Sequence, residues 1–255
     1  TMFAWRARIG LIKPTHRGKS FHFWYKHAPE GVEIVPTFIG FRSGKKEGFL
    51  NAFERAEQLA ADLKEVGCDI IAVSGTPPFL IKGLDFERQW AGKLAKKIGL
   101  PVVTPMEPHA IALKTMNVKR VAVATYYGQE LNQAIVDHFA RFGIESAVMQ
   151  GLSFRGQGEG LYTTPLLALD EVSYMDVYRH CKRGFKQLGA PCDAIYINGG
   201  GWDAAPAVEL LERDLKVKVI WALAAEMWFT YHKLAVNNPV EGCGILLREN
   251  PAPAS

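Results

Sequence analysis

Two short polar loops hold the residues best suited to chemistry, Ser74-Gly-Thr-Pro77 and Asn198-Gly-Gly-Gly201. Thr76 supplies a hydroxyl and a backbone N–H, the kind of donors that stabilise a developing oxyanion. Pro77 lacks an N–H, so one donor is missing there. The backbone amides after Gly199 are of the same kind as that of Thr76. The loops therefore predict a pocket for an anionic group, and the alternative for the first loop is a plain Thr-Pro turn.

Two further segments add a titratable group and a phenol. The segment Lys13-Pro-Thr-His-Arg-Gly18 contains His16, which titrates near neutrality and can transfer a proton or hold a carboxylate. The alternative for His16 is a solvated loop histidine. The segment Thr125-Tyr-Tyr-Gly128 contains Tyr127, whose hydroxyl can donate to a negative charge in an apolar cleft. The alternative for Tyr127 is a core tyrosine.

The first two loops end two copies of one motif. Cys68-Asp-Ile-Ile-Ala-Val73 and Cys192-Asp-Ala-Ile-Tyr-Ile197 both begin with Cys-Asp and continue as apolar runs that are too short for helices. Such a run, followed by small turn-forming residues, indicates a buried strand that opens into a loop. Gly75 and Gly199 then occupy the same slot in the two copies.

Matching apolar strands surround both copies. Ile9–Ile12 and Leu100–Thr104 flank the first, while Val121–Ala124 and Val217–Trp221 flank the second. Strands that alternate with helices favour parallel pairing with right-handed crossovers, and ligands bind at the carboxyl ends of such strands. We therefore predict an α/β fold of two similar parallel-sheet halves related by pseudo-two-fold symmetry, with the active site in the cleft between them. The expected divisions are residues 1–114, 115–225 and a C-terminal helix and strand at 226–255.

Helix signals refine these divisions. Helical spacing of apolar residues predicts an amphipathic helix over Glu47–Val66 that ends at Gly67, and another helix over Asp170–Leu188. Asp203 is placed to cap the helix that follows the triple glycine. Gly242–Leu247 is expected to form a final short strand.

Composition excludes several classes of protein. The formal net charge of +4, from 30 basic and 26 acidic residues in 255, is too mild to predict nucleic-acid binding and modestly favours anionic substrates. No apolar run approaches the ~20 residues that a membrane helix needs. The segment Thr1–Arg8 lacks the apolar core of a signal peptide, so the default expectation is a cytoplasmic location.

The cysteines and histidines predict neither disulfides nor a metal site. Four cysteines are too few and too scattered for a disulfide framework. Cys68 and Cys192 precede strands at the edge opposite the ligand, so we expect buried packing residues. No pair has zinc-ligand spacing, and the histidines are dispersed.

The chain resembles the aspartate/glutamate racemase superfamily, and within it the arylmalonate decarboxylases and maleate isomerases. The resemblance rests on Ile9-Gly-Leu-Ile-Lys-Pro14, Ser74–Pro77, Val121–Tyr127 with Asn132, and Asn198–Gly201, in an order that extends from Ile9 to Leu247. Members of the superfamily place one or two cysteines in the slots of Gly75 and Gly199, as acid and base. Arylmalonate decarboxylases keep glycine in the first slot and cysteine in the second, whereas this chain has glycine in both.

The resemblance implies a cofactor-independent lyase, and we expect a decarboxylase of a small malonate-like or related carboxylic acid that passes through an enediolate. Thr76, Tyr127 and His16 are the expected catalytic residues, and the C-terminal segment is expected to return to the first half. Expected substrate-binding residues are Pro14, Thr15, Gly75, Pro77, Thr125, Tyr126, Asn132, Asn198, Gly199 and Gly200. The alternatives are an isomerase or racemase in which His16 or another group replaces the cysteines, and a catalytically silent carboxylate-binding protein. Neither a nucleic acid nor a membrane is expected as a partner, and a homo-oligomer is possible.

Overall fold

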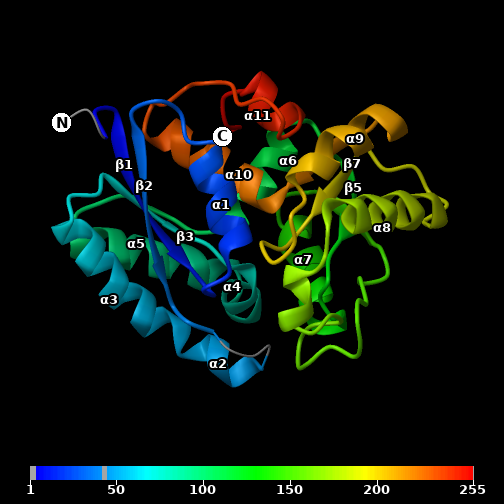
Figure 1. The fold of residues 1–255 in the computed structure, drawn as a ribbon, viewed down its shortest axis with the longest axis horizontal. Coiled ribbons are helices and arrows are strands. Elements are labelled where there is room, and N and C mark those ends of the chain that lie inside the picture. Colours follow the sequence, from blue (N-terminus) through cyan, green and yellow to red (C-terminus); the bar gives the residue numbers. More distant parts are fainter. Residues whose placement is uncertain (1–3, 42–44, 255) are drawn as a thin grey trace.

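The computed structural model describes residues 4–41 and 45–254, and this part contains two four-stranded parallel sheets side by side (Figure 1). Strand order is β2-β1-β3-β4 in the first sheet and β6-β5-β7-β8 in the second. The shared order and direction confirm the predicted α/β class with two similar halves. The strands are β1 (Ala7–Lys13), β2 (Val32–Phe38), β3 (Ile70–Val73), β4 (Val102–Val103), β5 (Arg120–Ala124), β6 (Glu145–Val148), β7 (Ala194–Ile197) and β8 (Lys218–Trp221).

The register of the central strands brings the two loops of each half together. Ile12 of β1 pairs with Val73 of β3, so Lys13 and Ser74 leave the sheet side by side. In the second half, Ala124 of β5 pairs with Ile197 of β7. All residues of β3 and β7 are buried, as expected of parallel strands that are covered on both faces.

Helices cover both sheets. Those of the first half are α1 (Gly18–Lys26), α2 (Lys46–Leu50), α3 (Ala52–Glu65), α4 (Thr76–Lys82), α5 (Leu84–Ile98) and α6 (Met106–Thr115). Later in the chain come α7 (Gln129–Ala140), the 3-10 helix η1 (Leu167–Asp170), α8 (Tyr174–Gln187), α9 (Ala205–Leu215), α10 (Ala222–Lys233) and α11 (Ile245–Glu249). Among the described residues, none of the helices is long and apolar enough to cross a membrane. Residues 1–3, which belong to the segment without a signal-peptide pattern, lie outside this part.

Helix α10 joins the two halves. It follows β8 of the second sheet and packs against α6, β3 and β4 of the first half (Figure 1). Most of its residues are buried, including Glu226, which is 4% exposed. A helix that is apolar on nearly all sides belongs in the interior, where a charged residue requires partners.

Two predicted helices differ at their boundaries. The helix predicted over Glu47–Val66 is two helices, α2 and α3, separated at Asn51. Asparagine favours turns because its side chain competes for backbone hydrogen bonds. Helix α8 begins only at Tyr174, because Ser173 and Asp176 form a capping box in which each side chain accepts a hydrogen bond from the other residue's backbone N–H.

Two other predictions about local structure are wrong. Asp203 does not cap α9, which begins at Ala205 without a side-chain cap and with a proline in its first turn. Proline needs no N–H partner there, and its fixed φ favours the start of a helix. Gly242–Leu247 is no strand, since α11 occupies Ile245–Glu249. A short apolar run cannot be distinguished from a buried helical turn by its periodicity alone.

Candidate active site

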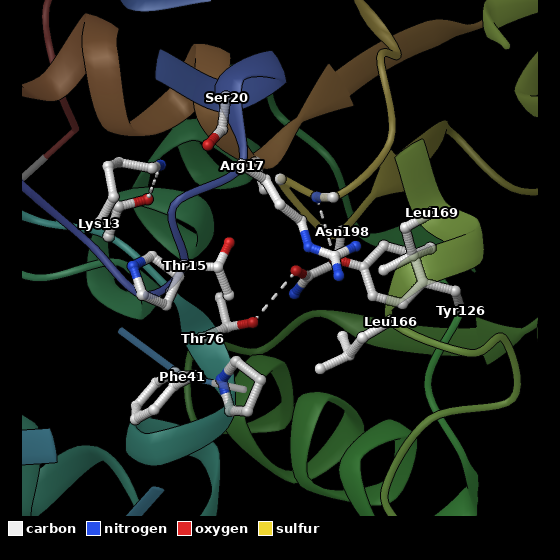
Figure 2. A pocket seen from close by; sticks show the side chains of 18 of the residues that line it. Lys13, Thr15, Arg17, Ser20, Phe41, Thr76, Tyr126, Leu166, Leu169 and Asn198 are labelled. Carbon is white, nitrogen blue, oxygen red and sulfur yellow. Dashed lines mark hydrogen bonds between the residues drawn. The ribbon is translucent and has the colours of Figure 1, made fainter. Parts of the chain in front are cut away.

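A pocket lies where the carboxyl ends of the central strands of both sheets face each other (Figure 2). Gly75 and Gly199 both line it, one from each half, as the repeat predicts. Residues 13–77 contribute Lys13, Pro14, Thr15, Arg17, Ser20, Phe41, Phe49, Ser74, Gly75, Thr76 and Pro77. Residues 126–226 contribute Tyr126, Tyr127, Tyr162, Leu166, Leu169, Asn198, Gly199, Gly200, Gly201, Ala222, Leu223 and Glu226.

The two glycine slots are filled by neighbouring side chains. At Gly75 the φ angle is +108°, and an added Cβ would lie 2.9 Å from Cγ of Pro14. At Gly199 the φ angle is +117°, and an added Cβ would lie 2.3 Å from Cε1 of Tyr126. Both backbone conformations disfavour any residue with a side chain. A cysteine in either slot therefore requires Pro14 or Tyr126 to move.

Three buried polar groups meet on one wall of the pocket. The Thr76 hydroxyl lies 2.8 Å from the Tyr127 hydroxyl, and Asn198 Oδ1 accepts from both, at 3.2 Å and 3.4 Å. Among the described residues, Nδ2 of Asn198 has no hydrogen-bond partner. Burial raises the pKa of Tyr127 well above its ordinary value, so the phenol stays neutral and can donate. This cluster can direct several N–H and O–H donors at one anionic oxygen pair.

The predicted binding residues Thr125 and Asn132 lie behind this wall and do not line the pocket. Thr125 Oγ1 donates to Asn132 Oδ1 over 2.7 Å and accepts from the Tyr127 N–H over 3.0 Å. Asn132 Nδ2 donates to the carbonyl oxygen of Tyr127 over 2.9 Å. Both residues therefore position the backbone that carries Tyr127, without reaching a ligand themselves.

The structure does not bring His16 to the pocket. Its side chain is exposed and stacks on Phe38, with ring centroids 5.1 Å apart. The neighbouring Pro14, Thr15 and Arg17 do line the pocket. A loop at a strand end sends successive side chains in different directions, and the sequence alone does not specify which of them turn inward.

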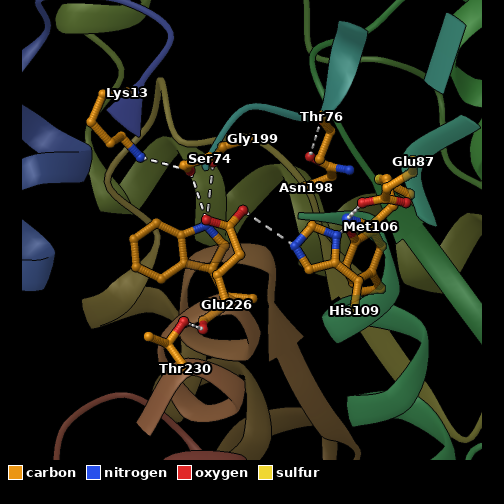
Figure 3. Close-up of polar contacts among 12 residues, drawn as sticks. Lys13, Ser74, Thr76, Glu87, Met106, His109, Asn198, Gly199, Glu226 and Thr230 are labelled. Atoms are coloured by element: carbon orange, nitrogen blue, oxygen red, sulfur yellow. Dashed lines mark hydrogen bonds and ion pairs between the residues drawn. The ribbon is translucent and has the colours of Figure 1, made fainter. Parts of the chain in front are cut away.

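A buried polar network that the sequence did not predict links Lys13, Ser74, Glu226 and His109 (Figure 3), and it extends to Tyr196. Lys13 Nζ donates to Ser74 Oγ over 2.8 Å, and Ser74 Oγ donates to Glu226 Oε2 over 2.6 Å. His109 Nε2 lies 3.4 Å from Glu226 Oε1, and His109 Nδ1 lies 2.8 Å from the Tyr196 hydroxyl. The first three members line the pocket.

Burial changes the acidity of Lys13 in this polar network. The Lys13 residue is 1% exposed, and desolvation lowers the pKa of its ammonium to about 8, although the Glu226 carboxylate opposes that shift. The sequence signal for Lys13 was a lysine at the carboxyl end of a buried strand, next to the ligand edge. Glu226 gave a weaker signal, as a lone acid in an apolar helix. His109 is completely buried, whereas Glu107, its neighbour in α6, pairs with Arg88 at 2.8 Å outside the pocket.

The rest of the pocket combines one further cation with an apolar wall. Arg17 points toward Asn198 and Tyr126 (Figure 2), and its Nη1 has no hydrogen-bond partner among the described residues. Nη1 of Arg17 forms a long ion pair with Oδ2 of Asp170, at 3.7 Å. The apolar lining consists mainly of Phe41, Phe49, Leu166, Leu169 and Leu223. No three His, Cys, Asp or Glu residues gather as metal ligands anywhere in residues 4–41 and 45–254.

The paired sheets and facing strand-end loops define an α/β protein with the aspartate/glutamate racemase-like fold. Residues 9–247 match the family model described as arylmalonate decarboxylase. The chain belongs to the arylmalonate decarboxylase family.

Three similar proteins illustrate this relationship. The arylmalonate decarboxylase of Bordetella bronchiseptica is 25% identical over 220 residues, which cover 86% of this chain and 87% of the relative. The maleate isomerase of Pseudomonas putida S16, solved with maleate as a cysteine-to-alanine variant, superposes with a TM-score of 0.83 at 20% identity, covering 95% of this chain and 97% of the isomerase. A liganded double mutant of arylmalonate decarboxylase gives 0.82 at 22% identity, covering 94% and 98%. The two structural matches establish a shared fold.

Proposed function

We propose that this protein is a cofactor-independent decarboxylase of a small malonate-like acid. The observation that carries the proposal is one pocket that holds both a cluster of neutral donors, Thr76, Tyr127 and Asn198, and several apolar side chains. Decarboxylation needs both features, because one carboxylate must be held while the other loses its charge as carbon dioxide.

The retained carboxylate would bind against the hydroxyl and amide cluster. As the carbon–carbon bond breaks, its electron pair moves into this carboxylate and forms an enediolate with two negative oxygens. Hydroxyls of Thr76 and Tyr127 can rotate from their present partners to these oxygens, and Asn198 Nδ2 is available as a third donor. Arg17 adds positive charge on the same side (Figure 2).

The leaving carboxylate would face Leu166, Leu169 and Phe41. An apolar surface withdraws water from this carboxylate and gives it no compensating hydrogen bonds, whereas neutral carbon dioxide suffers no such penalty. The environment thereby favours loss of carbon dioxide over retention of the dianion. The product would be the monocarboxylic acid once the α-carbon receives a proton.

The isomerase alternative has weaker support in this chain. In the related superfamily, isomerases and racemases use cysteines in the slots that Gly75 and Gly199 occupy here, and Pro14 and Tyr126 fill the space beside those slots. All four cysteines are buried, and none of them lines the pocket. Covalent or two-base chemistry through a thiol therefore has no suitable group at the site.

A substrate panel tests the proposal. Purified protein is incubated with malonate, methylmalonate, phenylmalonate, maleate and L-aspartate, with a chelator and no added cofactor. We expect release of carbon dioxide from at least one malonate and no conversion of maleate to fumarate. Isomerisation of maleate without carbon dioxide release contradicts the proposal in favour of an isomerase. Saturable binding of a malonate without turnover contradicts it in favour of a carboxylate-binding protein.

A further inference from the structure

The donors described so far hold charge, but none of them supplies the proton that must reach the α-carbon. In the family this task falls to a cysteine, and this chain has Gly199 in that slot. We propose that Lys13 is the proton donor, with Ser74 and Glu226 as positioning residues that orient its ammonium group toward the pocket. This inference rests on the proposed decarboxylation.

Geometry supports Lys13 first. Its side chain is buried and still lines the pocket, and Ser74 and Glu226 line the pocket beside it. Ser74 Oγ takes one of the three N–H donors of the ammonium, over 2.8 Å. A short hydrogen bond of 2.6 Å from Ser74 to Glu226 then fixes the hydroxyl. The ammonium is therefore held at one place on the first-half wall of the pocket (Figure 3).

The surroundings of Lys13 keep its ammonium group protonated at pH 7 and still acidic enough to donate a proton. Desolvation lowers its pKa to about 8, and the Glu226 carboxylate limits that decrease, so most of the protein carries the charged form at pH 7. His109 of α6 lies against the far oxygen of Glu226, while Arg17 and Tyr126 face the same pocket. A donor with a pKa close to the working pH is the most effective general acid.

The proton transfer balances without a co-reactant. Breakage of the carbon–carbon bond leaves its electron pair on the α-carbon and the retained carboxylate, as an enediolate. The α-carbon forms a C–H bond with the Lys13 proton and that electron pair, and Lys13 becomes a neutral amine. The amine then takes a proton from water, so that the net reaction consumes one proton and releases one carbon dioxide.

Tyr126 is the rival donor, because its hydroxyl lies 2.7 Å from the position that a Cβ at Gly199 would take. Burial raises the pKa of Tyr126 to about 12, and its oxygen accepts a hydrogen bond of 3.1 Å from the Gly201 N–H. A phenol that holds its proton this tightly is a weaker acid than the Lys13 ammonium. The two groups lie on opposite sides of the pocket (Figure 2), so they would protonate opposite faces of an enediolate.

The experiment uses the prochiral probe 2-methyl-2-phenylmalonate and measures both carbon dioxide release and the enantiomeric excess of 2-phenylpropionate. Wild-type protein should give one enantiomer in excess. Lys13→Met should lower kcat by about a hundredfold or more, and the remaining product should be close to racemic because water protonates the enediolate. Lys13→Arg keeps the charge, but a guanidinium does not release a proton near pH 7. The KM of this variant should therefore stay near that of the wild type while its kcat falls.

A pH profile gives a second readout. Wild-type kcat/KM should fall as the pH rises through about 8, because only the ammonium form can donate. Lys13→Arg should lack this descending limb. The double variant Lys13→Met/Glu226→Gln removes both buried charges together and guards against misfolding of the single variant, and circular dichroism checks each protein.

The outcomes separate the two proposals. Product from a folded Lys13 variant with wild-type enantiomeric excess and pH profile overturns the role of Lys13 and leaves the decarboxylase proposal standing. Racemic product from Tyr126→Phe, with Lys13→Met still selective, assigns the donor to Tyr126 instead. Wild-type protein that releases no carbon dioxide from any malonate overturns the proposed function, and the inference fails with it.

Discussion

The two halves of the pocket have the same frame and different chemistry. Register places Lys13 and Ser74 at the ends of β1 and β3 in the same relation as Thr125 and Asn198 at the ends of β5 and β7. The next residue fills the glycine slot in both halves: Pro14 stands beside Gly75, and Tyr126 beside Gly199.

The difference lies in what those positions carry. In the first half, Lys13 is a buried cation that Ser74 links to Glu226. In the second half, Thr125 is neutral and supports the loop of Tyr127, whose hydroxyl joins Asn198 at the pocket. A repeated fold thus fixes where strand ends meet, while single residues at those ends determine whether a wall offers a proton or neutral hydrogen bonds.

The largest expected effect comes from removing a donor of the neutral cluster of Thr76, Tyr127 and Asn198. We predict that Tyr127→Phe lowers kcat by about a hundred- to a thousandfold, the cost of one lost oxyanion donor. Steady-state kinetics on the malonate that the panel identifies measures this effect. Tyr25→Phe is the control, because Tyr25 is 66% exposed and lies outside the pocket.

Thermal melting distinguishes this role from a structural one. If the Tyr127 hydroxyl mainly satisfies buried partners, its removal should instead cost ~1 to 3 kcal/mol of stability. A Tyr127→Phe protein with wild-type turnover on the true substrate removes Tyr127 from the mechanism.

A second variant breaks the slot itself. Gly199→Ala places a Cβ 2.3 Å from the Tyr126 ring at a φ of +117°. A strained backbone alone costs about 1 to 3 kcal/mol. We therefore expect the free energy of unfolding, measured by urea denaturation, to fall by at least this amount. Gly143→Ala is the matched control, since Gly143 also has a positive φ, +72°, but nothing lies within 4 Å of its added Cβ. Equal losses in the two variants would show that Tyr126 does not block the slot.

The smallest expected effect concerns thiols. Burial raises the pKa of Cys68 to about 11 and those of Cys181 and Cys243 to about 12, and burial also raises the pKa of Cys192. Iodoacetamide at neutral pH should therefore label the folded protein slowly and leave turnover unchanged, because thiolates are the reactive form. Urea-unfolded protein provides the labelling control. Stoichiometric loss of activity after labelling one cysteine, with unchanged circular dichroism, would contradict a mechanism without thiols.

Much of the fold could be predicted from local sequence patterns. The repeated Cys-Asp motif, with Gly75 and Gly199 in the same slot, predicted paired parallel halves, because strand length and turn residues are local properties of the chain. The same pattern placed Thr76 and Asn198 at the ligand edge, since Asn198 directly follows the buried strand β7 and Thr76 lies in the short loop after the buried strand β3. Boundaries were less predictable: Asn51 interrupts one helix, and the end of the Gly242–Leu247 run belongs to helix α11 instead of a strand.

Only the tertiary structure decided which side chains share the pocket. Glu226 lies far from Ser74 in the sequence, and their 2.6 Å hydrogen bond depends on how α10 packs between the halves. His16 and Lys13 are three positions apart, yet Lys13 is buried in the pocket and His16 is exposed. The sequence determined the strands, the loops and the absence of cysteine from both slots. Burial, and with it the acidity of Lys13, arises from surrounding elements that no local pattern encodes, because desolvation depends on everything packed around the group.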